Sequence, residues 1–346
     1  MDTPRGPRAE KAYRTGVVVG KFDPPHRGHH FLIETASGCC EHLVVIVARR
    51  PGEPLPAELR AACLREVHPE ADVRVVEDAV PADDSAGWAA YTCQILGYRP
   101  EAAFTSEDYG DAWARAMGAR HVCVDRERRA VPCSGSRIRA DPLGSLGWLS
   151  PFMRAVYVRR VCVLGAESTG TTTLAKALAE RYGTVWVPEY GREYCVEKWE
   201  EGYTTDWRTE EFVAIAREQS RREDEAARVA NRVVFCDTDA FATAIWHRRY
   251  VGRRSPEVEA LALRRPCHLY LLTGDEISFE QDGLRDGEEI RHWMHETFAR
   301  ELAGSGRPWA LLRGPHETRL AAGVGLVDAL LAGPVAPWVA LPGTGA

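Results

Sequence analysis

The chain has 346 residues, of which 45% are apolar and 27% charged, and its formal net charge at pH 7 is −6. This length favours two domains over one, and the negative charge argues against a general nucleic-acid-binding protein. No run of about 18 apolar residues is present to span a membrane, and the ten cysteines include no C-x-x-C pair. We therefore expect a cytoplasmic protein with reduced thiols that binds small molecules, neither nucleic acid nor membrane, with a homo-oligomer left open.

The first informative stretch is residues 20–30, GKFDPPHRGHH, which follow an apolar run and precede a helical pattern. A strand-to-helix turn of this kind presents backbone N–H groups and the positive end of a helix dipole to an anion. His26 and His29 add imidazoles that can donate hydrogen bonds to phosphate oxygens, and Gly28 allows a close approach of the backbone. The stretch indicates a site for a nucleoside triphosphate that is attacked at its α-phosphorus. Two incidental surface histidines are the alternative.

Apolar runs alternate with helical patterns through the first half of the chain. Strands are expected at residues 16–19, 43–47, 73–76, 102–105 and 121–124, with helices at 57–67, 87–96 and 111–117. Repeated β–α units with short connections predict a doubly wound parallel sheet, in which ligands bind at the carboxyl ends of the strands. The histidine turn lies at one of these ends.

Residues 131–142, VPCSGSRIRADP, form a second pattern typical of phosphate binding. Ser134 and Ser136 open a helix with hydroxyl groups, and the Arg139 guanidinium would reach the β- and γ-phosphates or the pyrophosphate leaving group. By itself this stretch fits a capped helix with two surface arginines better. Its combination with the histidine turn favours a shared phosphate site.

An apolar strand at residues 160–164 is followed by the loop GAESTGTTTL and an alanine-rich helix to residue 182. This order predicts a P-loop domain, with hydroxyls at Thr172 and Thr173 placed for Mg²⁺. Thr171 stands where P-loop enzymes carry a lysine, which leaves the fold prediction strong but weakens the prediction of catalysis. The predicted ATP contacts of the loop are Gly165, Ser168, Thr169, Gly170, Thr171, Thr172 and Thr173.

Polar residues beyond other strands of the second domain extend this predicted site. Asp237 ends an apolar strand and is expected to hold Mg²⁺ or accept a proton from a substrate hydroxyl, whereas Asp239 is either a substrate ligand or a helix N-cap. The glycine-rich residues 282–287 are typical of a mobile lid, from which Arg285 would reach ATP. The many charges of the helix at 208–231 are interpreted as a solvated face rather than a site. The predicted substrate residues are Glu189, Tyr190, Arg192, Asp239 and Asp282.

The histidine turn resembles the nucleotidyltransferase superfamily, whose members transfer AMP or CMP and release pyrophosphate. The order of all these motifs resembles the NadR-type proteins, which fuse a nicotinamide mononucleotide adenylyltransferase to a ribosylnicotinamide kinase. The resemblance implies that the first domain converts ATP and nicotinamide mononucleotide into NAD and pyrophosphate, and that the second phosphorylates ribosylnicotinamide with ATP and Mg²⁺. In the first domain, the residues assigned to phosphate stabilisation are His26, His29, Lys21 and Arg139. Those assigned to ATP binding are Gly20, Phe22, Gly28, Ser134 and Ser136. Trp88 is assigned to stacking on nicotinamide, and the alternative is a position in the core or on the surface.

We therefore predict two doubly wound α/β domains, a Rossmann-like nucleotidyltransferase domain at residues 15–155 and a P-loop kinase domain at 156–335. Residues 1–14 are expected to be disordered, and residues 336–346 form a tail. Two alternatives stay open, namely a second domain that only binds nucleotide and regulates, and an adenylyltransferase for phosphopantetheine or flavin mononucleotide. The DNA-binding module of the repressor members has no counterpart here, so transcriptional control is not expected.

Overall fold

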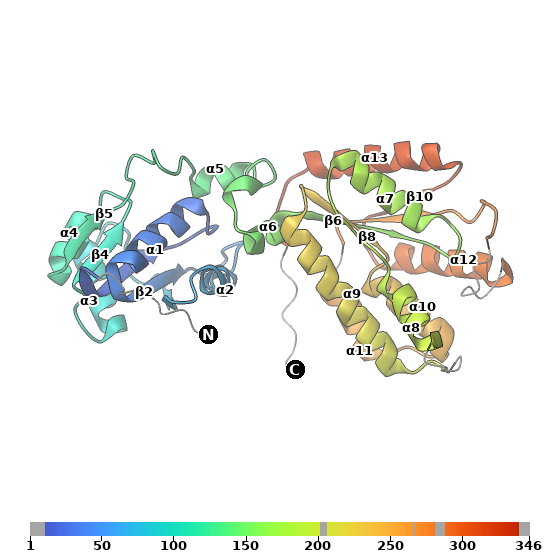
Figure 1. The fold of residues 1–346 in the computed structure, drawn as a ribbon, viewed down its shortest axis with the longest axis horizontal. Helices are drawn as coiled ribbons and strands as arrows, with labels where there is room; N and C mark the ends of the chain where they lie inside the picture. Colours follow the sequence, from blue (N-terminus) through green and yellow to red (C-terminus); the bar gives the residue numbers. More distant parts are fainter. Residues whose placement is uncertain (1–10, 201–205, 266, 281–287, 339–346) are drawn as a thin grey trace, which may run out of the picture. The chain divides into compact units, whose positions relative to one another are not determined.

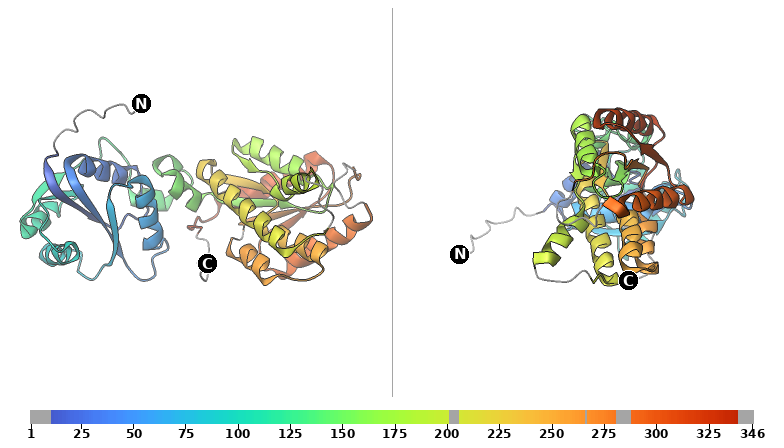
Figure 2. Two further views of the ribbon diagram at one scale, coloured as in Figure 1. Left: turned by 60° about the horizontal axis from the view of Figure 1, so that its bottom comes forward. Right: turned by 90° about the vertical axis from the view of Figure 1, so that its right-hand side faces the viewer.

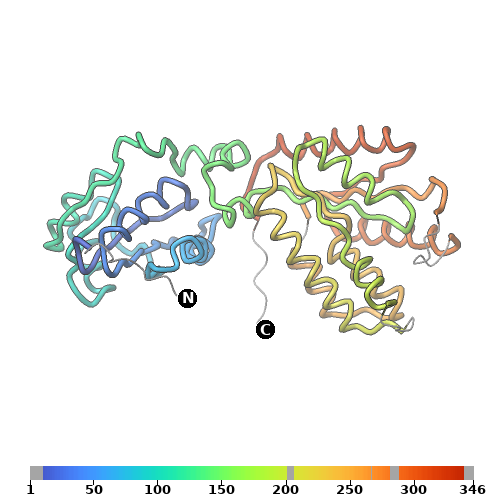
Figure 3. Tube along the Cα trace, in the orientation of Figure 1, coloured from blue at the N-terminus to red at the C-terminus, as the bar shows by residue number. Residues whose placement is uncertain are grey.

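The computed structural model describes residues 11–200, 206–265, 267–280 and 288–338. The chain divides into two compact units, residues 1–153 and 154–346, and each contains a parallel five-stranded sheet (Figure 1). The trace in Figure 3 passes between the units along α6 Pro151–Tyr157. The prediction of two doubly wound α/β domains is confirmed.

The first unit is built around β1, the central strand of a sheet with the order β3-β2-β1-β4-β5. Its strands are β1 Tyr13–Gly20, β2 Cys40–Arg49, β3 Asp72–Glu77, β4 Ala102–Thr105 and β5 Arg120–Cys123. Its helices are α1 Arg27–Cys39, α2 Ala57–Val67, α3 Ser85–Leu96, α4 Gly110–Met117, α5 Gly135–Ala140, the short 3₁₀ helix η1 Leu146–Trp148, and the start of α6. The chain order reverses between β1 and β4, which is where open α/β sheets bind ligands.

Alternate residues of the strands face opposite layers of helices. Val18 and Val45 pack with α1 and α2, whereas Val17, Val44 and Ile46 pack with α3 and α4. Helices therefore cover both faces of the sheet (Figure 2), as the continuous apolar strands require. This packing fixes the end of β1, and with it the turn that follows.

The second unit repeats this plan around β6, with the strand order β10-β9-β6-β8-β7. Its strands are β6 Arg159–Leu164, β7 Trp186–Val187, β8 Val233–Asp237, β9 Leu269–Thr273 and β10 Trp309–Leu312. Its helices are α7 Thr171–Tyr182, α8 Tyr190–Glu200, α9 Thr209–Val229, α10 Ala240–Val251, α11 Pro256–Arg264, α12 Glu288–Gly304 and α13 His316–Ala332. In neither unit do the described residues form a helix that could cross a membrane.

Helix α9 corrects one interpretation of the sequence. The charges of this helix predicted a solvated face, but Glu211, Gln219 and Glu223 are at most 8% exposed. Glu211 is paired with Lys198, whose Nζ lies 2.8 Å from its carboxylate, and ion pairing of this kind makes a buried carboxylate tolerable. One face of α9 therefore belongs to the interior, and the site uses it.

Close packing predicts the effect of one glycine substitution in β1. A Cβ atom at Gly16 would lie 2.3 Å from the Cys40 sulfur and 3.0 Å from the Phe104 ring. Gly16→Ala should therefore lower the free energy of unfolding by about 1–3 kcal/mol, measured by urea denaturation. Gly38→Ala is the control, because nothing lies within 4 Å of the added methyl, and it should raise stability by about 0.5–1 kcal/mol. Equal effects of the two substitutions would contradict this account of the packing.

Candidate active sites

The histidine turn forms the N-terminus of α1. His26 is the N-cap residue, and its Nδ1 accepts hydrogen bonds from the backbone amides of Gly28 (3.1 Å) and His29 (3.4 Å). The His26 and His29 rings stack with 3.7 Å between their centroids. Because Nδ1 of His26 accepts, the neutral ring carries its proton on Nε2. The turn therefore combines a helix N-terminus with an imidazole N–H donor.

The surroundings keep both imidazoles neutral. Burial, followed by the positive charge of Arg128, lowers the pKa of His26 to about 4. Burial, followed by the neighbouring His26 ring, lowers the pKa of His29 well below its usual range, and the His29 Nδ1 is buried without a hydrogen-bond partner among the described residues. Arg128 was not identified from the sequence, because it lies in an irregular segment between β5 and α5. The positive charge of the site thus comes from other side chains than these imidazoles, and Arg128 is one of them.

The serine-rich turn packs directly against the histidine turn. The Cys133 sulfur lies 3.4 Å from Nδ1 of His26, and Arg139 donates a hydrogen bond to the backbone oxygen of Asp23. A Cβ atom on Gly135 would lie 2.8 Å from the same Asp23 oxygen, so a larger residue would separate the two turns. The two stretches that sequence analysis combined therefore lie together.

The two predicted serines contact their own helix, α5. The Ser134 hydroxyl accepts from the backbone amide of Arg137 at 3.3 Å and caps the helix, as the alternative interpretation of this stretch expected. The Ser136 hydroxyl accepts from Nη2 of Arg139 at 3.2 Å. These bonds orient Arg139, and contact of the serines with ATP stays a prediction.

Packing accounts for three further residues of the histidine turn. Phe22 is 3% exposed, and its ring meets the His29 ring edge-on with centroids 5.0 Å apart. A Cβ atom on Gly20 would lie 3.2 Å from the Phe22 ring, and one on Gly28 would lie 3.0 Å from the His26 ring. Both glycines therefore make room for the rings that shape the turn.

Lys21 and Trp88 are the two remaining predictions in this unit. Lys21 follows β1, and its Nζ lies 3.8 Å from the buried carboxylate of Asp78, just beyond β3. Trp88 lies on α3, packs against the core between the sheet and α3, and has Tyr91 as a ring neighbour at 5.9 Å. Its contacts are those of the core alternative, and stacking on nicotinamide stays a prediction.

In the second unit, residues 165–173 form a compact loop between β6 and α7. Ser168 and Gly170 have left-handed backbone angles, with φ of 58° and 79°, and Gly170 is the N-cap of α7. The Thr169 hydroxyl lies 2.7 Å from the Thr273 hydroxyl at the end of β9. The loop is thereby anchored to the sheet, and the N-terminus of α7 is available to an anion.

Thr172 and Asp237, the two residues predicted to hold Mg²⁺, lie in contact beside this loop, and metal binding stays a prediction. The Thr172 hydroxyl donates to the Asp237 carboxylate at 2.5 Å, and burial raises the pKa of Asp237. Burial, followed by the charge of Asp237, raises the pKa of Glu189 to about 8. Hydroxyl and carboxylate oxygens fit Mg²⁺ that takes its other ligands from phosphate and water. No group of three His, Cys, Asp or Glu side chains in the described parts of the chain could hold a metal alone.

A cavity of about 390 Å³ extends from the P-loop to a wall of aromatic rings. Trp207, Phe212, Trp246 and Tyr250 form this wall, and the Tyr250 ring centroid lies 5.5 Å from that of Trp207 and 6.0 Å from that of Trp246. Sequence analysis missed all four, although the spacing of Trp246 and Tyr250 places them one helical turn apart. The cavity therefore joins a phosphate-binding end to an aromatic end.

Two of the predicted substrate residues lie in the wall of the cavity, and two others do not. Glu189 and Arg192 line it, whereas Tyr190 is not among the described residues that do. The Tyr190 ring instead lies under the Arg222 guanidinium, 4.4 Å from its centroid. Asp282 and Arg285, which are predicted to contact substrate and ATP, lie outside the described residues.

Asp239 has the contacts of a helix cap. One carboxylate oxygen accepts from the amides of Phe241 (3.0 Å) and Ala242 (3.1 Å), and the other accepts from the Tyr270 hydroxyl at 2.8 Å. The residue is 2% exposed and does not line the cavity. The capping alternative thus describes its contacts, and a role toward substrate stays a prediction.

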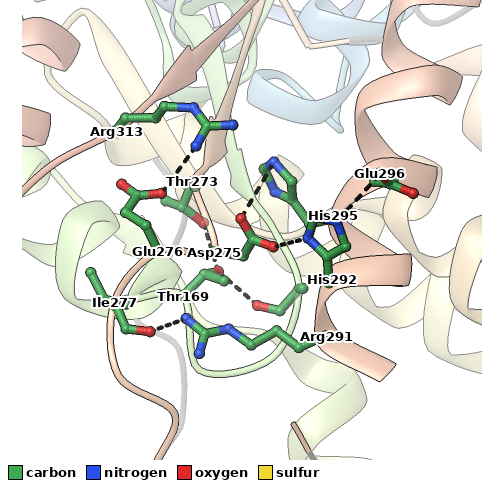
Figure 4. Close-up of polar contacts among 12 residues, drawn as sticks. Thr169, Thr273, Asp275, Glu276, Ile277, Arg291, His292, His295, Glu296 and Arg313 are labelled. Atoms are coloured by element: carbon green, nitrogen blue, oxygen red, sulfur yellow. Dashed lines mark hydrogen bonds and ion pairs between the residues drawn. The ribbon is translucent and has the colours of Figure 1, made fainter. Parts of the chain in front are cut away.

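The segment after β9 is held between the P-loop and α12 (Figure 4). The Asp275 carboxylate lies 2.8 Å from Nδ1 of His292, and Arg291 donates to the backbone oxygen of Ile277 at 2.5 Å. Ile277 lines the cavity and approaches Gly170 of the loop. Contacts of the Arg291 and His292 side chains of α12 with this segment therefore position part of the cavity wall.

Comparison with known proteins places both units. Residues 17–141 match the cytidylyltransferase-like family, and residues 160–319 match a family described as an AAA domain. The trifunctional NAD biosynthesis/regulator protein NadR of Salmonella typhimurium is 30% identical over 304 residues, which cover 81% of this chain and 73% of that protein. The chain belongs to the NadR family. The Escherichia coli protein of the same name is also 30% identical, over 305 residues with the same shares.

Solved structures agree with the membership of the NadR family. A NadR protein in complex with NR has a TM-score of 0.75 and 20% identity, over 93% of this chain and 98% of that one. A second, in complex with NAD and AMP-PNP, has a TM-score of 0.72 and 20% identity, over 97% and 99%. The predicted resemblance, the fold and the assignment as an enzyme with a nucleotidyltransferase domain are confirmed.

The buried imidazoles predict how stability depends on pH. Burial lowers the pKa of His26 and of His30 from 6.5 to about 4, so the unfolded chain binds more protons than the folded chain between these values. Stability is therefore complete above pH 6.5 and falls as the pH decreases toward 4. His26→Asn keeps a capping side chain and should reduce this pH dependence in urea denaturation at pH 7 and pH 5. The exposed His42→Asn is the control, and identical pH profiles for all three proteins would contradict the prediction.

Proposed function

We propose that the first unit transfers the adenylyl group of ATP to nicotinamide mononucleotide, which yields NAD and pyrophosphate. An oxygen of the mononucleotide phosphate attacks the α-phosphorus, and the bond to the pyrophosphate leaving group breaks, so no covalent intermediate with the enzyme is needed. The observation that carries this proposal is the contact of the histidine turn with the serine-rich turn through Arg139 and Asp23. Membership of the NadR family and the complex of a relative with NAD and AMP-PNP support it.

Each side chain of this site has a role that follows from its contacts. The His26 ring would donate from Nε2 to a phosphate oxygen, because its Nδ1 is occupied by backbone amides. Arg139 and Lys21 would balance the charge that develops on the pyrophosphate. Positioning and charge stabilisation then account for the catalysis. Release of pyrophosphate with nicotinamide mononucleotide, phosphopantetheine or flavin mononucleotide as acceptor tests the choice of substrate.

For the second unit, we propose phosphorylation of ribosylnicotinamide. The substrate hydroxyl attacks the γ-phosphorus of ATP, ADP leaves, and the hydroxyl proton passes to a carboxylate such as Asp237. The observation that carries this proposal is a cavity with the P-loop at one end and aromatic rings at the other. A pyridinium cation is attracted by the faces of aromatic rings. When bound, Mg²⁺ would be held by Thr172 and, through a water molecule, by Asp237, and it would offset phosphate charge.

A second candidate function for this unit is a nucleotide-binding regulator without catalysis. Thr171 in place of the P-loop lysine is the observation that favours it, because that lysine stabilises the charge of the transferred phosphate. ADP formation that depends on ribosylnicotinamide distinguishes the two candidates. In the full chain, NAD formation from ribosylnicotinamide and ATP alone would require both proposed activities.

His29→Ala should lower the rate of adenylyl transfer about 10²–10³-fold, the usual effect of removing one preorganised donor. The measurement is pyrophosphate release from ATP and nicotinamide mononucleotide, with the melting temperature as the test of folding. His42→Ala, on an exposed position of β2, is the control and should leave the rate unchanged. Full activity in a folded His29→Ala protein would remove His29 from the mechanism.

Asp237→Asn should lower ribosylnicotinamide-dependent ADP formation about 10²–10⁴-fold, the range for loss of a general base. The substitution keeps the size of a buried side chain that contacts Thr172. Adenylyl transfer by the same protein is the internal control, since its site lies in the other unit. Loss of both activities would mean that the substitution disturbs the whole chain, and retention of both would exclude Asp237 as the base.

A further inference from the structure

The P-loop of the second unit presents a charge problem. Thr171 supplies no cation, and Arg192 is the one cationic side chain among the described residues that line the cavity. Most of the charge of a bound polyphosphate would therefore have to be balanced by positive charge and oriented amides that act on it from elsewhere. The residues behind the loop, outside the cavity, are the place to look.

Arg319 of α13 lies behind the loop and is 3% exposed. Its Nη1 donates to the backbone oxygen of Thr169 at 2.7 Å, its Nη2 to that of Gly274 at 3.0 Å, and its Nε to that of Gly314 at 2.7 Å. Thr169 belongs to the P-loop, whereas Gly274 and Gly314 follow β9 and β10. One buried guanidinium thus joins the loop to the ends of two neighbouring strands.

The bond to Thr169 also sets the direction of the next amide. A trans peptide is planar, so the N–H of Gly170 points away from the Thr169 carbonyl that Arg319 holds. Thr169 is 1% exposed, whereas Gly170 lines the cavity. Arg319 therefore keeps the Thr169 carbonyl oxygen, which would repel phosphate, turned away from the cavity. The N–H group of Gly170 then faces the cavity as a donor.

The charge of Arg319 is only partly neutralised. Its carboxylate partner, Glu276, accepts from Arg319 at 2.8 Å but also lies 3.7 Å from Nη1 of Arg313. Two arginines share one carboxylate, which leaves positive charge beside the loop, and burial of Arg319 limits the screening of that charge by solvent. We propose that Arg319 is a positioning residue that replaces, from behind the P-loop, part of what the missing lysine would supply to ATP. This inference rests on the proposed function, in which the second unit binds ATP.

A double-mutant cycle with Thr171 tests the proposal. Calorimetry measures the binding of ADP with Mg²⁺ to the full chain, and the binding event that is lost in Thr172→Ala is assigned to the P-loop. Arg319→Met should raise the dissociation constant of this event on the order of 10- to 100-fold, the scale for a hydrogen bond to a charged group. In a Thr171→Lys background, the same substitution should cost only a few-fold, because a cation is restored. Equal losses in both backgrounds, or no loss, would overturn the proposal.

Matched variants distinguish an effect of Arg319 on ADP binding from a role of Arg319 in folding alone. Arg313→Met removes the exposed arginine that shares Glu276 without touching the loop, and should change ADP affinity less than about 2-fold because solvent screens its charge. Glu276→Gln keeps an acceptor for Arg319 and removes the negative charge, so ADP should bind more tightly. If Arg319→Met does not fold, the two variants Glu276→Gln and Arg319→Lys are used for the test in its place. Weaker ADP binding by Glu276→Gln would overturn the charge argument.

The test of Arg319 and the test of the proposed kinase function can fail independently of each other. Absence of ribosylnicotinamide-dependent ADP formation in the wild type would refute the kinase proposal, while ADP affinity would still report on Arg319. Conversely, a working kinase whose ADP affinity is indifferent to Arg319→Met would retain the function and refute the inference.

Discussion

Both sites depend on one constraint, the passage of a central parallel strand directly into a helix. β1 leads into α1 and β6 into α7, so each helix N-terminus lies at the carboxyl edge of its own sheet, where the order of the strands reverses. The first amides of a helix have no partner within it, and the helix dipole adds positive character there. An anion at this edge is therefore bound by the backbone before any side chain contributes.

The titratable groups around this helix N-terminus differ between the two units. At the first, burial lowers the pKa of His26 and His29, so that neutral donors and arginines surround the turn. At the second, burial raises the pKa of Asp237 and Glu189, so that carboxyl groups with a raised affinity for protons surround the loop. Adenylyl transfer to a phosphate nucleophile needs no base, whereas attack by a substrate hydroxyl does. The difference between the two reactions that we propose is thus visible in which groups are buried.

Local patterns predicted the strands of the first sheet, β6 and β8 of the second, and the loops that follow β1 and β6, because each is encoded by a few adjacent residues. β10, α11 and α12 were not predicted, and phosphate binding by the two loops stays a prediction. The aromatic wall was not predicted, since Trp207 and Phe212 precede or begin α9 whereas Trp246 and Tyr250 lie on α10, and only tertiary packing brings them together. The charge pattern of α9 was misleading for the same reason, because it does not reveal which charges find a partner inside. Arg319 gives no local signal, as its partners lie in three different loops.

Tertiary contacts of this kind explain how a loop can lose a motif residue and keep its shape. The Thr169 hydroxyl is held by Thr273 at 2.7 Å, and Ser168 accepts from the amide of Glu280 at 2.8 Å. Neither contact involves position 171, so a lysine there is not needed to build the turn. What the lysine would add is charge at the phosphates, which is a separate requirement from loop geometry. The conformation of the P-loop therefore does not depend on a lysine at position 171, and the threonine there directly changes only the charge at the phosphates.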